Sequence, residues 1–425
     1  MLKGQFPVEK FASLRTPFYY YDLPLLRRTL DKIRECIEPY PQFHVHYAVK
    51  ANFNGKILQE ISRCGFGADC VSGGEIRAAL QNGFAPESIV YAGVGKSDEE
   101  ILLALDAGIA RFNVESAAEL EVINELALSR GVVAPVSLRV NPDIGAHTHA
   151  NITTGLAENK FGINYEQLPG VIELADSLPG VKDKGLHFHI GSQILEMDDF
   201  VALCNRINVL AEQILRQRRG RLVPAASSAA AVGYSSSAVG AAGVAGSGVA
   251  AGVAGAAASV LGDINVGGGL GINYYHPNHL DVAEFSQYFE TFARHLKLPE
   301  GTPVHFELGR SVVAPCGSLI SRVLYIKEGT TRRFAIIDAS MTELIRPALY
   351  KAYHRVENIS SYEPEEVYDV VGPVCESSDV FAKGVSIDKC HRGDFIAIRS
   401  AGAYGESMSS QYNCRPLPGC FFKED

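Results

Sequence analysis

Short apolar runs alternate with amphipathic stretches between residues 40 and 310. Eight runs, rich in β-branched and aromatic residues, predict strands: His44–Val49, Phe66–Cys70, Ser88–Ala92, Ala110–Val114, Pro135–Asn141, Gly185–Ile190, Asp263–Val266 and Val304–Leu308. The stretches around them space their apolar residues as a helix does: Leu25–Ile37, Gly55–Cys64, Gly74–Gln81, Asp98–Ala107, Ala117–Ser129, Tyr165–Leu178 and Phe200–Arg216. This alternation is typical of repeated βα units in an α/β fold.

Eight strands with crossover helices favour a (β/α)8 TIM-type barrel, although a doubly wound open sheet has the same local pattern. The helix expected at Leu25–Ile37 precedes the first strand and is placed to close the ring in place of one after the eighth. After Arg310 the runs become short and are separated by turn residues, which predicts a mostly antiparallel β domain: Leu319–Ile326, Phe334–Asp338, Glu366–Val371 and Asp394–Ile398. We expect Phe18–Tyr21 to join that sheet. The predicted domains are a barrel over 24–311 and a β-sandwich or β-barrel over 1–23 and 312–425.

Residues 224–260 fit neither pattern. From Pro224 to Val260 the chain consists almost entirely of Ala, Gly, Val and Ser, without a charge. Such a composition favours neither a stable helix nor a packed core, because it combines flexible residues with small side chains. We interpret this segment as an insertion in the barrel, on the face away from the chemistry.

Composition narrows the class of protein. The chain has 425 residues, of which 47% are hydrophobic and 20% charged, and its net charge of −9 is the wrong sign for nucleic acid. No run is long and apolar enough for a membrane span, and Met1–Pro7 lacks the apolar stretch of a secretion signal. The nine cysteines are scattered without a C-x-x-C pair, as in reduced cytoplasmic proteins. We therefore expect a soluble cytoplasmic protein.

Chemically capable residues lie at the carboxyl ends of most of the predicted strands, which is where a barrel carries its active site. They are Lys50, Asp69, Glu115, Asn141, His189 with Ser192, the Gly267-Gly268-Gly269 run, and Glu307 with Arg310. Lys50 is either a surface lysine or an amine whose pKa an apolar pocket lowers, so that it can attack carbonyl groups. The glycine run after the seventh strand is either a tight turn or a backbone site for phosphate.

Several of these groups also have structural interpretations. His187 and His189 share one face of the sixth strand, either as buried structural side chains or beside a planar cofactor; no metal-ligand spacing accompanies them, so we expect no metal site. Glu307 and Arg310 are either an ion pair or a cofactor-binding carboxylate and a substrate-binding guanidinium. In the β domain, Cys375 is a buried inert thiol or a proton donor among acidic groups.

Four segments occur in the order of a known family. They are Tyr47–Asn52 (YAVKAN), Asp69–Glu75 (DCVSGGE), the stretch from Arg139–Asp143 (RVNPD) through Asn159–Gly162 (NKFG), and His187–Gln193 (HFHIGSQ). They resemble the fold-type III pyridoxal-phosphate (PLP) decarboxylases, and the last two resemble the branch that acts on diaminopimelate. The resemblance covers nearly the whole chain outside Pro224–Val260.

The resemblance implies a role for each site residue. Lys50 carries PLP, Asp69 lies near it, His189 stacks on its ring, Glu307 meets its nitrogen, and Tyr404 lies against it. Ser192, Gly267, Gly268, Gly269, Gly309 and Arg310 complete the cofactor site. Arg310, Arg346, Tyr350, Glu376 and Tyr404 hold the substrate, and Cys375 is the proton donor. In this family Cys375 and Glu376 come from the second subunit, so the resemblance implies a homodimer with shared active sites.

The implied reaction is decarboxylation of meso-2,6-diaminoheptanedioate (meso-diaminopimelate) to L-lysine, the last step of lysine biosynthesis. One alternative is a related decarboxylase of ornithine, arginine, lysine or carboxynorspermidine. Substrates of that group without a distal carboxylate would leave arginines unpaired. Another alternative is a non-catalytic regulator on the same fold, although such a protein would not need both Lys50 and Cys375.

Overall fold

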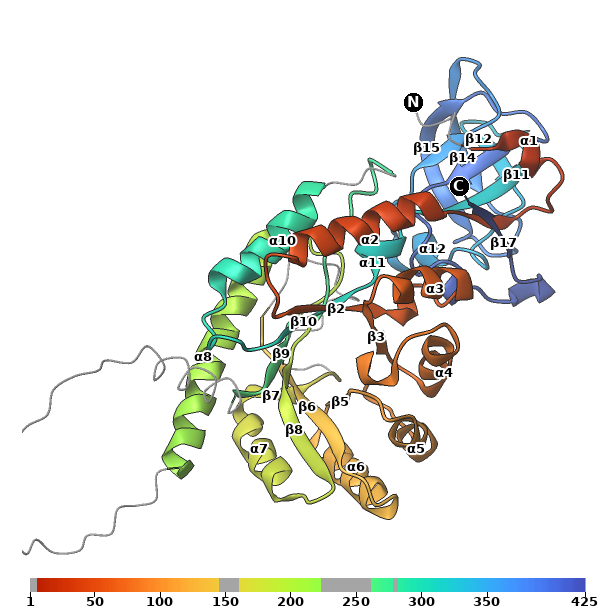
Figure 1. The fold of residues 1–425 in the computed structure, drawn as a ribbon. Coiled ribbons are helices and arrows are strands. Elements are labelled where there is room, and N and C mark those ends of the chain that lie inside the picture. Colours follow the sequence, from red (N-terminus) through yellow and green to blue (C-terminus); the bar gives the residue numbers. More distant parts are fainter. Residues whose placement is uncertain (1–5, 145–159, 223–260, 278–281, 425) are drawn as a thin grey trace, which may run out of the picture.

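The computed structural model describes residues 6–144, 160–222, 261–277 and 282–424. Two sheets organise these residues, one a closed parallel ring and the other mostly antiparallel. In Figure 1 the two sheets lie at opposite ends of an elongated molecule, with both chain termini at the antiparallel end. The expected insertion Pro224–Val260 lies outside the described residues.

The parallel ring contains all eight strands predicted for the barrel. They are β2 (Phe43–Ala48), β3 (Gly67–Cys70), β4 (Ile89–Tyr91), β5 (Arg111–Val114), β6 (Ala134–Asn141), β8 (Val181–His187), β9 (Asp263–Asn265) and β10 (Val304–Leu308). Parallel pairing of β10 with β2 and of β5 with β6 closes the ring, which excludes the open doubly wound sheet. A short strand, β7 (Ile163–Asn164), pairs beside β6. The sixth predicted strand is shifted, since β8 ends at His187 rather than Ile190.

Helices surround this ring. They are α2 (Leu23–Ile37), α3 (Gly55–Arg63), α4 (Gly73–Gln81), α5 (Asp98–Ala107), α6 (Ala117–Ser129), α7 (Leu168–Ser177), α8 (Met197–Leu222), α10 (Val282–His295) and the short α11 (Arg310–Val313). The side chains of Ser72, Ser97 and Ser116 accept hydrogen bonds from the first turns of α4, α5 and α6, which explains where these helices begin.

The prediction that the helix before the first strand completes the ring is confirmed. Helix α2 packs between α10 and α3, while only the four-residue α11 follows the eighth strand (Figure 1). Helix α10 was not predicted from the sequence. Its aromatic residues Tyr288, Phe289 and Phe292 pack around Phe306 of β10, with ring centroids 5.0 to 5.7 Å apart.

The second sheet confirms the expected β domain. Its strands are β1 (Phe18–Asp22), β11 (Gly317–Glu328), β12 (Arg333–Ile337), β13 (Val356–Asn358), β14 (Glu365–Val371), β15 (Val380–Asp388), β16 (Phe395–Ile398) and β17 (Gly419–Lys423), with two short helices, α1 (Val8–Phe11) and α12 (Arg346–Tyr350). As predicted, Phe18–Tyr21 joins it, pairing with β11. Strands β13, β15 and β17 were not predicted from the sequence. The domain limits 24–311, 1–23 and 312–425 stay predictions.

The two sheets are joined directly beside Lys50. Asn52 donates from Nδ2 to the Tyr21 hydroxyl (2.8 Å) and to the Gly402 carbonyl (2.9 Å), and Tyr404 N donates to Ala51 O at 2.8 Å. These bonds fix the segment after β2 against the β domain, so residues of both sheets can form one site.

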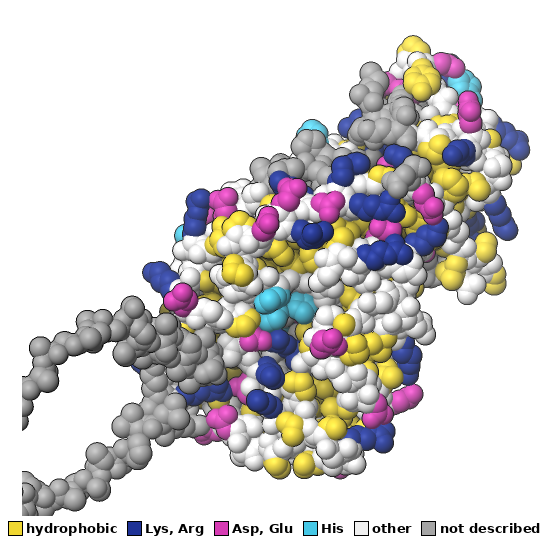
Figure 2. Space-filling model, in the orientation of Figure 1, with side chains coloured by type: hydrophobic (Ala, Val, Ile, Leu, Met, Phe, Trp, Pro, Cys, Tyr) yellow, Lys and Arg dark blue, Asp and Glu magenta, His cyan; other side chains and the backbone are white. Residues whose placement is uncertain are grey.

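None of the described helices has the length and apolar character to cross a membrane. On the face shown in Figure 2, basic and acidic side chains are interspersed.

Candidate active site

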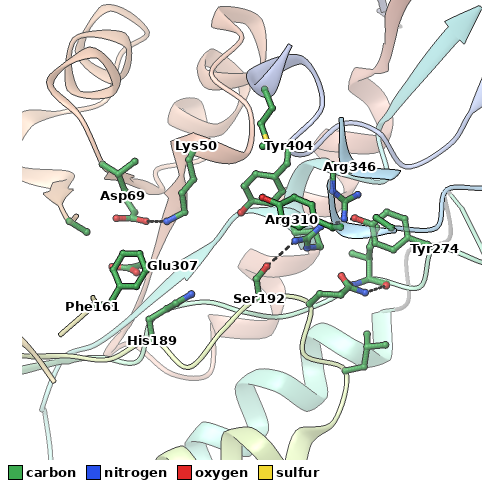
Figure 3. A pocket seen from close by; sticks show the side chains of 18 of the residues that line it. Lys50, Asp69, Phe161, His189, Ser192, Tyr274, Glu307, Arg310, Arg346 and Tyr404 are labelled. Atoms are coloured by element: carbon green, nitrogen blue, oxygen red, sulfur yellow. Dashed lines mark hydrogen bonds and ion pairs between the residues drawn. The ribbon is translucent and has the colours of Figure 1, made fainter. Parts of the chain in front are cut away.

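A cavity of about 660 Å³ opens at the carboxyl ends of the barrel strands, against the β domain. It brings together nine of the predicted site residues: Lys50, Asp69, His189, Ser192, Glu307, Arg310, Arg346, Tyr350 and Tyr404. Figure 3 shows Lys50 and Asp69 on one side of it and the two arginines on the other.

Lys50 lies in a single 3-10 turn, Val49–Ala51, directly after β2. Its Nζ is 3.4 Å from Asp69 Oδ2, and its side chain is 41% exposed into the cavity. Burial favours the neutral amine, but the negative charges of Asp69 and Glu307 outweigh burial and raise the pKa of Lys50. The expectation of a lowered Lys50 pKa is therefore wrong, because the pocket supplies carboxylates and not only apolar walls.

Glu307 points into the barrel because alternation along β10 sends Phe306 outward to α10. Its carboxylate accepts hydrogen bonds from Asn265 Nδ2 (2.8 Å), Asn113 Nδ2 (3.3 Å) and His187 Nε2 (3.1 Å). Burial alone would raise the pKa of Glu307, but the charge and hydrogen bond of His187 outweigh burial and hold the pKa well below its usual range. Glu307 is thus an ionised carboxylate in the floor of the cavity, and not the ion-pair partner of Arg310.

Both histidines of the sixth strand region line the cavity, as their alternation predicted. His189 Nδ1 accepts a hydrogen bond from Gly268 N at 3.3 Å, which puts the proton of the neutral ring on Nε2. Burial, assisted by the positive charges of Arg139 and Lys50, lowers the pKa of His189 to about 3. His189 therefore presents a neutral planar ring to the cavity.

Arg310, at the start of α11, is held from three sides. Its Nη1 donates to the Tyr274 hydroxyl at 2.8 Å and its Nη2 to Ser192 Oγ at 2.9 Å. The guanidinium also lies over the Tyr404 ring, 4.9 Å from the centroid. These contacts fix the orientation of the guanidinium without cancelling its charge.

Arg346, at the start of α12, lies beside Arg310 and over the Tyr274 ring, 5.0 Å from the centroid (Figure 3). Its Nη1 bonds His354 Nε2 at 2.8 Å. Burial and the charge of Arg310 lower the pKa of Arg346. Within the part of the chain that the structure describes, no carboxylate forms an ion pair with either arginine.

The predicted glycine residues pack behind the cavity rather than lining it. A Cβ on Gly267 would lie 2.2 Å from the Phe188 carbonyl oxygen, and a Cβ on Gly268 would lie 1.8 Å from that of Glu307. A Cβ on Gly309 would lie 3.1 Å from those of Ala48 and Ala51. These glycines allow the backbone to approach the residues that line the cavity. Gly269 has a φ of 109°, which disfavours any other residue.

Cys375 and Glu376, like the four glycines, are predicted site residues that do not line the cavity of this chain. Both are exposed, in the loop between β14 and β15. Asp379 anchors this loop, accepting hydrogen bonds from Val374 N (2.9 Å) and Met341 N (2.7 Å). The interpretation of Cys375 as a buried inert thiol is wrong.

Comparison with known proteins identifies the family. The model of the pyridoxal-dependent decarboxylase pyridoxal-binding domain matches residues 26–218. The diaminopimelate decarboxylase of Bacteroides thetaiotaomicron is 55% identical over 98% of both chains. The chain belongs to the diaminopimelate decarboxylase family. The crystal structure of the Helicobacter pylori diaminopimelate decarboxylase complexed with L-lysine superposes with a TM-score of 0.82 at 35% identity, covering 98% of this chain and 94% of that one. The M. jannaschii diaminopimelate decarboxylase, also with L-lysine, has a TM-score of 0.80 at 32% identity, covering 98% and 89%.

The cofactor of diaminopimelate decarboxylases, PLP, fits the residues present. PLP is an aldehyde that binds covalently through an amine, and the Nζ amine of Lys50 lies in the cavity. A pyridine nitrogen needs an ionised carboxylate to stay protonated, and Glu307 is one. Asp69 Oδ1 is buried and has no hydrogen-bond partner among the described residues, which leaves it available to a bound group. Burial, with the charge of Glu307, raises the pKa of Asp69.

The partners that hold these residues in place were not predicted from the sequence. Asn113 and Asn265 bind Glu307, while Tyr274 and His354 hold the two arginines. For Asn113 and Asn265 a usable signal exists: each is a polar residue inside an apolar strand, near its carboxyl end. For Tyr274 and His354 no such signal exists, because both lie in loops.

Proposed function

We propose that this protein removes carbon dioxide from meso-diaminopimelate to form L-lysine, with PLP bound through Lys50. The observation that carries the proposal is the pairing, in one cavity, of a lysine and an ionised Glu307 with two arginines that lack a carboxylate partner among the described residues. Arginines without a carboxylate partner suit a substrate that has a distal carboxylate, because a site built for charged groups rejects analogues lacking them.

The residues divide into cofactor and substrate groups. Lys50, Asp69, His189, Ser192, Glu307 and Tyr404 would hold PLP, supported by Gly267, Gly268, Gly269, Gly309 and Arg310. When bound, PLP accepts the electron pair that the departing carboxylate leaves on Cα. Glu307 keeps its charge for the ring nitrogen, and the neutral His189 offers an uncharged face.

At the opposite wall, Arg310, Arg346 and Tyr350 would bind the distal carboxylate of the substrate. Arg310 is oriented by Tyr274 and Ser192, so part of the entropy cost of ordering it is met before substrate arrives. Bidentate bonds from a guanidinium would fix a carboxylate in a plane, which a lysine could not do.

The active unit is a cytoplasmic homodimer in this proposal. Exposed apolar side chains rim the cavity: Tyr275 is 63% and Tyr353 43% exposed, and their rings stack 4.4 Å apart. A rim of exposed, largely apolar side chains is typical of a surface that packs against another protein chain. Glu376 of one subunit would then meet the substrate ammonium in the other cavity, and Cys375 would deliver a proton to Cα.

The test is carbon dioxide release from PLP-loaded protein, with meso-diaminopimelate, ornithine, arginine, lysine and carboxynorspermidine assayed side by side. We expect release from meso-diaminopimelate alone, with one L-lysine formed per carbon dioxide. Release from another of these substrates would reassign the substrate, and no release from any would contradict the proposal.

A further inference from the structure

The loop after α12 contains a buried histidine, His354, that contacts a wall residue of the cavity without lining the cavity itself. His354 is 1% exposed, and its Nε2 is 2.8 Å from Nη1 of Arg346. Arg346 is 5% exposed and has no ion-pair partner among the described residues. A buried guanidinium without a counter-ion needs hydrogen-bond acceptors to hold one orientation.

The two hydrogen bonds of His354 permit one protonation state. A guanidinium only donates, so Nε2 must be the unprotonated acceptor. Nδ1 then carries the proton and donates to the carbonyl oxygen of Arg399, 2.8 Å away. Burial and the neighbouring charge of Arg346 lower the pKa of His354 to about 3, so this neutral tautomer persists at neutral pH.

The carbonyl that fixes the tautomer belongs to the framework of the β domain. Arg399 follows β16, and its N–H donates to the carbonyl of Arg355 at 2.9 Å. Strand β13, which begins just after His354, pairs with β16 through Val356 and Ile398. The Tyr274 ring meets the His354 ring edge-on, with centroids 5.1 Å apart. The sheet thus holds the imidazole, and the imidazole holds Arg346.

We propose that His354 is a positioning residue that fixes the Arg346 guanidinium to bind a substrate carboxylate. It acts as a neutral acceptor linking the cavity wall to the β sheet. The inference rests on the proposed function, because it needs a carboxylate substrate in the cavity. It predicts that substrate affinity depends on the Nε2 contact rather than on the Nδ1 contact.

Two substitutions separate these contacts. In His354→Asn the amide nitrogen can take the place of Nδ1 and keep the bond to Arg399, but the shorter side chain does not reach Arg346. In His354→Gln the longer side chain can place an acceptor near Nε2, but the bond to Arg399 is lost. We expect His354→Asn to raise the KM for meso-diaminopimelate about 10- to 100-fold, the range for a hydrogen bond to a charged group, and His354→Gln to stay within about 3-fold of the wild type.

The readouts distinguish positioning from structural damage. We expect kcat and PLP content to change little in either variant. Inhibition by heptanedioate, a dicarboxylate, should weaken in His354→Asn, whereas inhibition by pentane-1,5-diamine should not. His391→Gln, at an exposed histidine of the β domain, is the matched control and should keep wild-type kinetics.

Two results would overturn the inference: a His354→Asn variant with wild-type KM, or a His354→Gln variant as impaired as His354→Asn. If one variant loses PLP or unfolds early, the other variant decides, through the ratio of its inhibition constants for heptanedioate and pentane-1,5-diamine. A ratio unchanged from the wild type in His354→Asn, or a ratio in His354→Gln that shifts as expected for His354→Asn, contradicts positioning. Failure of the wild type to release carbon dioxide from meso-diaminopimelate would instead contradict the proposed function.

Discussion

At the scale of single residues, the charged side chains of the cavity differ in the hydrogen-bond partners that hold them. Glu307 is stabilised as an anion by three hydrogen-bond donors, of which two are uncharged amides. The third donor, His187, is also the group whose charge lowers the Glu307 pKa. The arginines on the far wall are likewise oriented by hydroxyl and imidazole groups instead of carboxylates. The arginine wall therefore keeps its positive charge available for bound groups, because neutral partners orient a guanidinium without neutralising it.

Glu307→Gln tests this arrangement. We expect kcat to fall about 100-fold or more, because a neutral amide cannot keep the ring nitrogen of PLP protonated. PLP should remain attached to Lys50, as borohydride reduction and mass spectrometry of the Lys50 peptide can measure. Glu300→Gln, at an exposed glutamate before β10, is the control and should behave as wild type. A Glu307→Gln variant with wild-type kcat would remove Glu307 from the chemistry.

At the scale of elements, a glycine loop packs closely against a barrel strand and positions residues of the site. The Gly267–Gly269 loop leaves β9 and passes directly over β10, where Glu307 N donates to Gly267 O at 2.8 Å. The same loop bonds His189 through Gly268 N. Two residues that line the cavity are therefore positioned by one glycine loop that does not itself line the cavity.

We expect Gly268→Ala to destabilise the protein by about 1–3 kcal/mol, because its Cβ would lie 1.8 Å from the Glu307 carbonyl oxygen and backbone must move. PLP content should fall with it. Gly170, in α7, is a matched control because a Cβ there meets nothing within 4 Å. Gly170→Ala should stabilise the protein by about 1 kcal/mol. Thermal and urea unfolding measure both changes, and equal stability of Gly268→Ala and wild type would show that the loop has room.

Only some of the elements and site residues could be predicted from the sequence. The eight barrel strands and the strand-end residues Lys50, Asp69, His189 and Glu307 could be predicted, because parallel strands place their carboxyl ends together. The strands β13 and β17 could not, since segments of three and five residues carry too little periodicity. Helix α10 and strand β15 are longer and were missed, although Phe285, Phe289 and Phe292 of α10 have helical spacing. The pKa shift of Lys50 and the role of His354 depend on residues brought close only by the fold.

At the scale of the whole molecule, the cavity of a single chain contains only some of the proposed catalytic groups. Lys50 and Glu307 line its cavity, whereas Cys375 and Glu376 are exposed on a loop of the β domain. Asp379 accepts two backbone hydrogen bonds and gives that loop a defined shape despite its exposure. A defined exposed loop with a thiol and a carboxylate suits insertion into the cavity of a second copy, and a homodimer with shared sites is the arrangement that would use it.

Mixing two inactive variants tests this arrangement. In a mixed dimer of Lys50→Ala with Cys375→Ala, one site receives both changes and the other receives neither. Random exchange makes half the dimers mixed, so we expect recovery of about a quarter of wild-type activity. Mixing Lys50→Ala with Glu307→Gln should recover none, because both residues line the cavity of the same chain and each site keeps one change. Native mass spectrometry verifies that subunits have exchanged. If mixed dimers form and the first pair stays as inactive as the second, Cys375 acts in its own subunit or not at all.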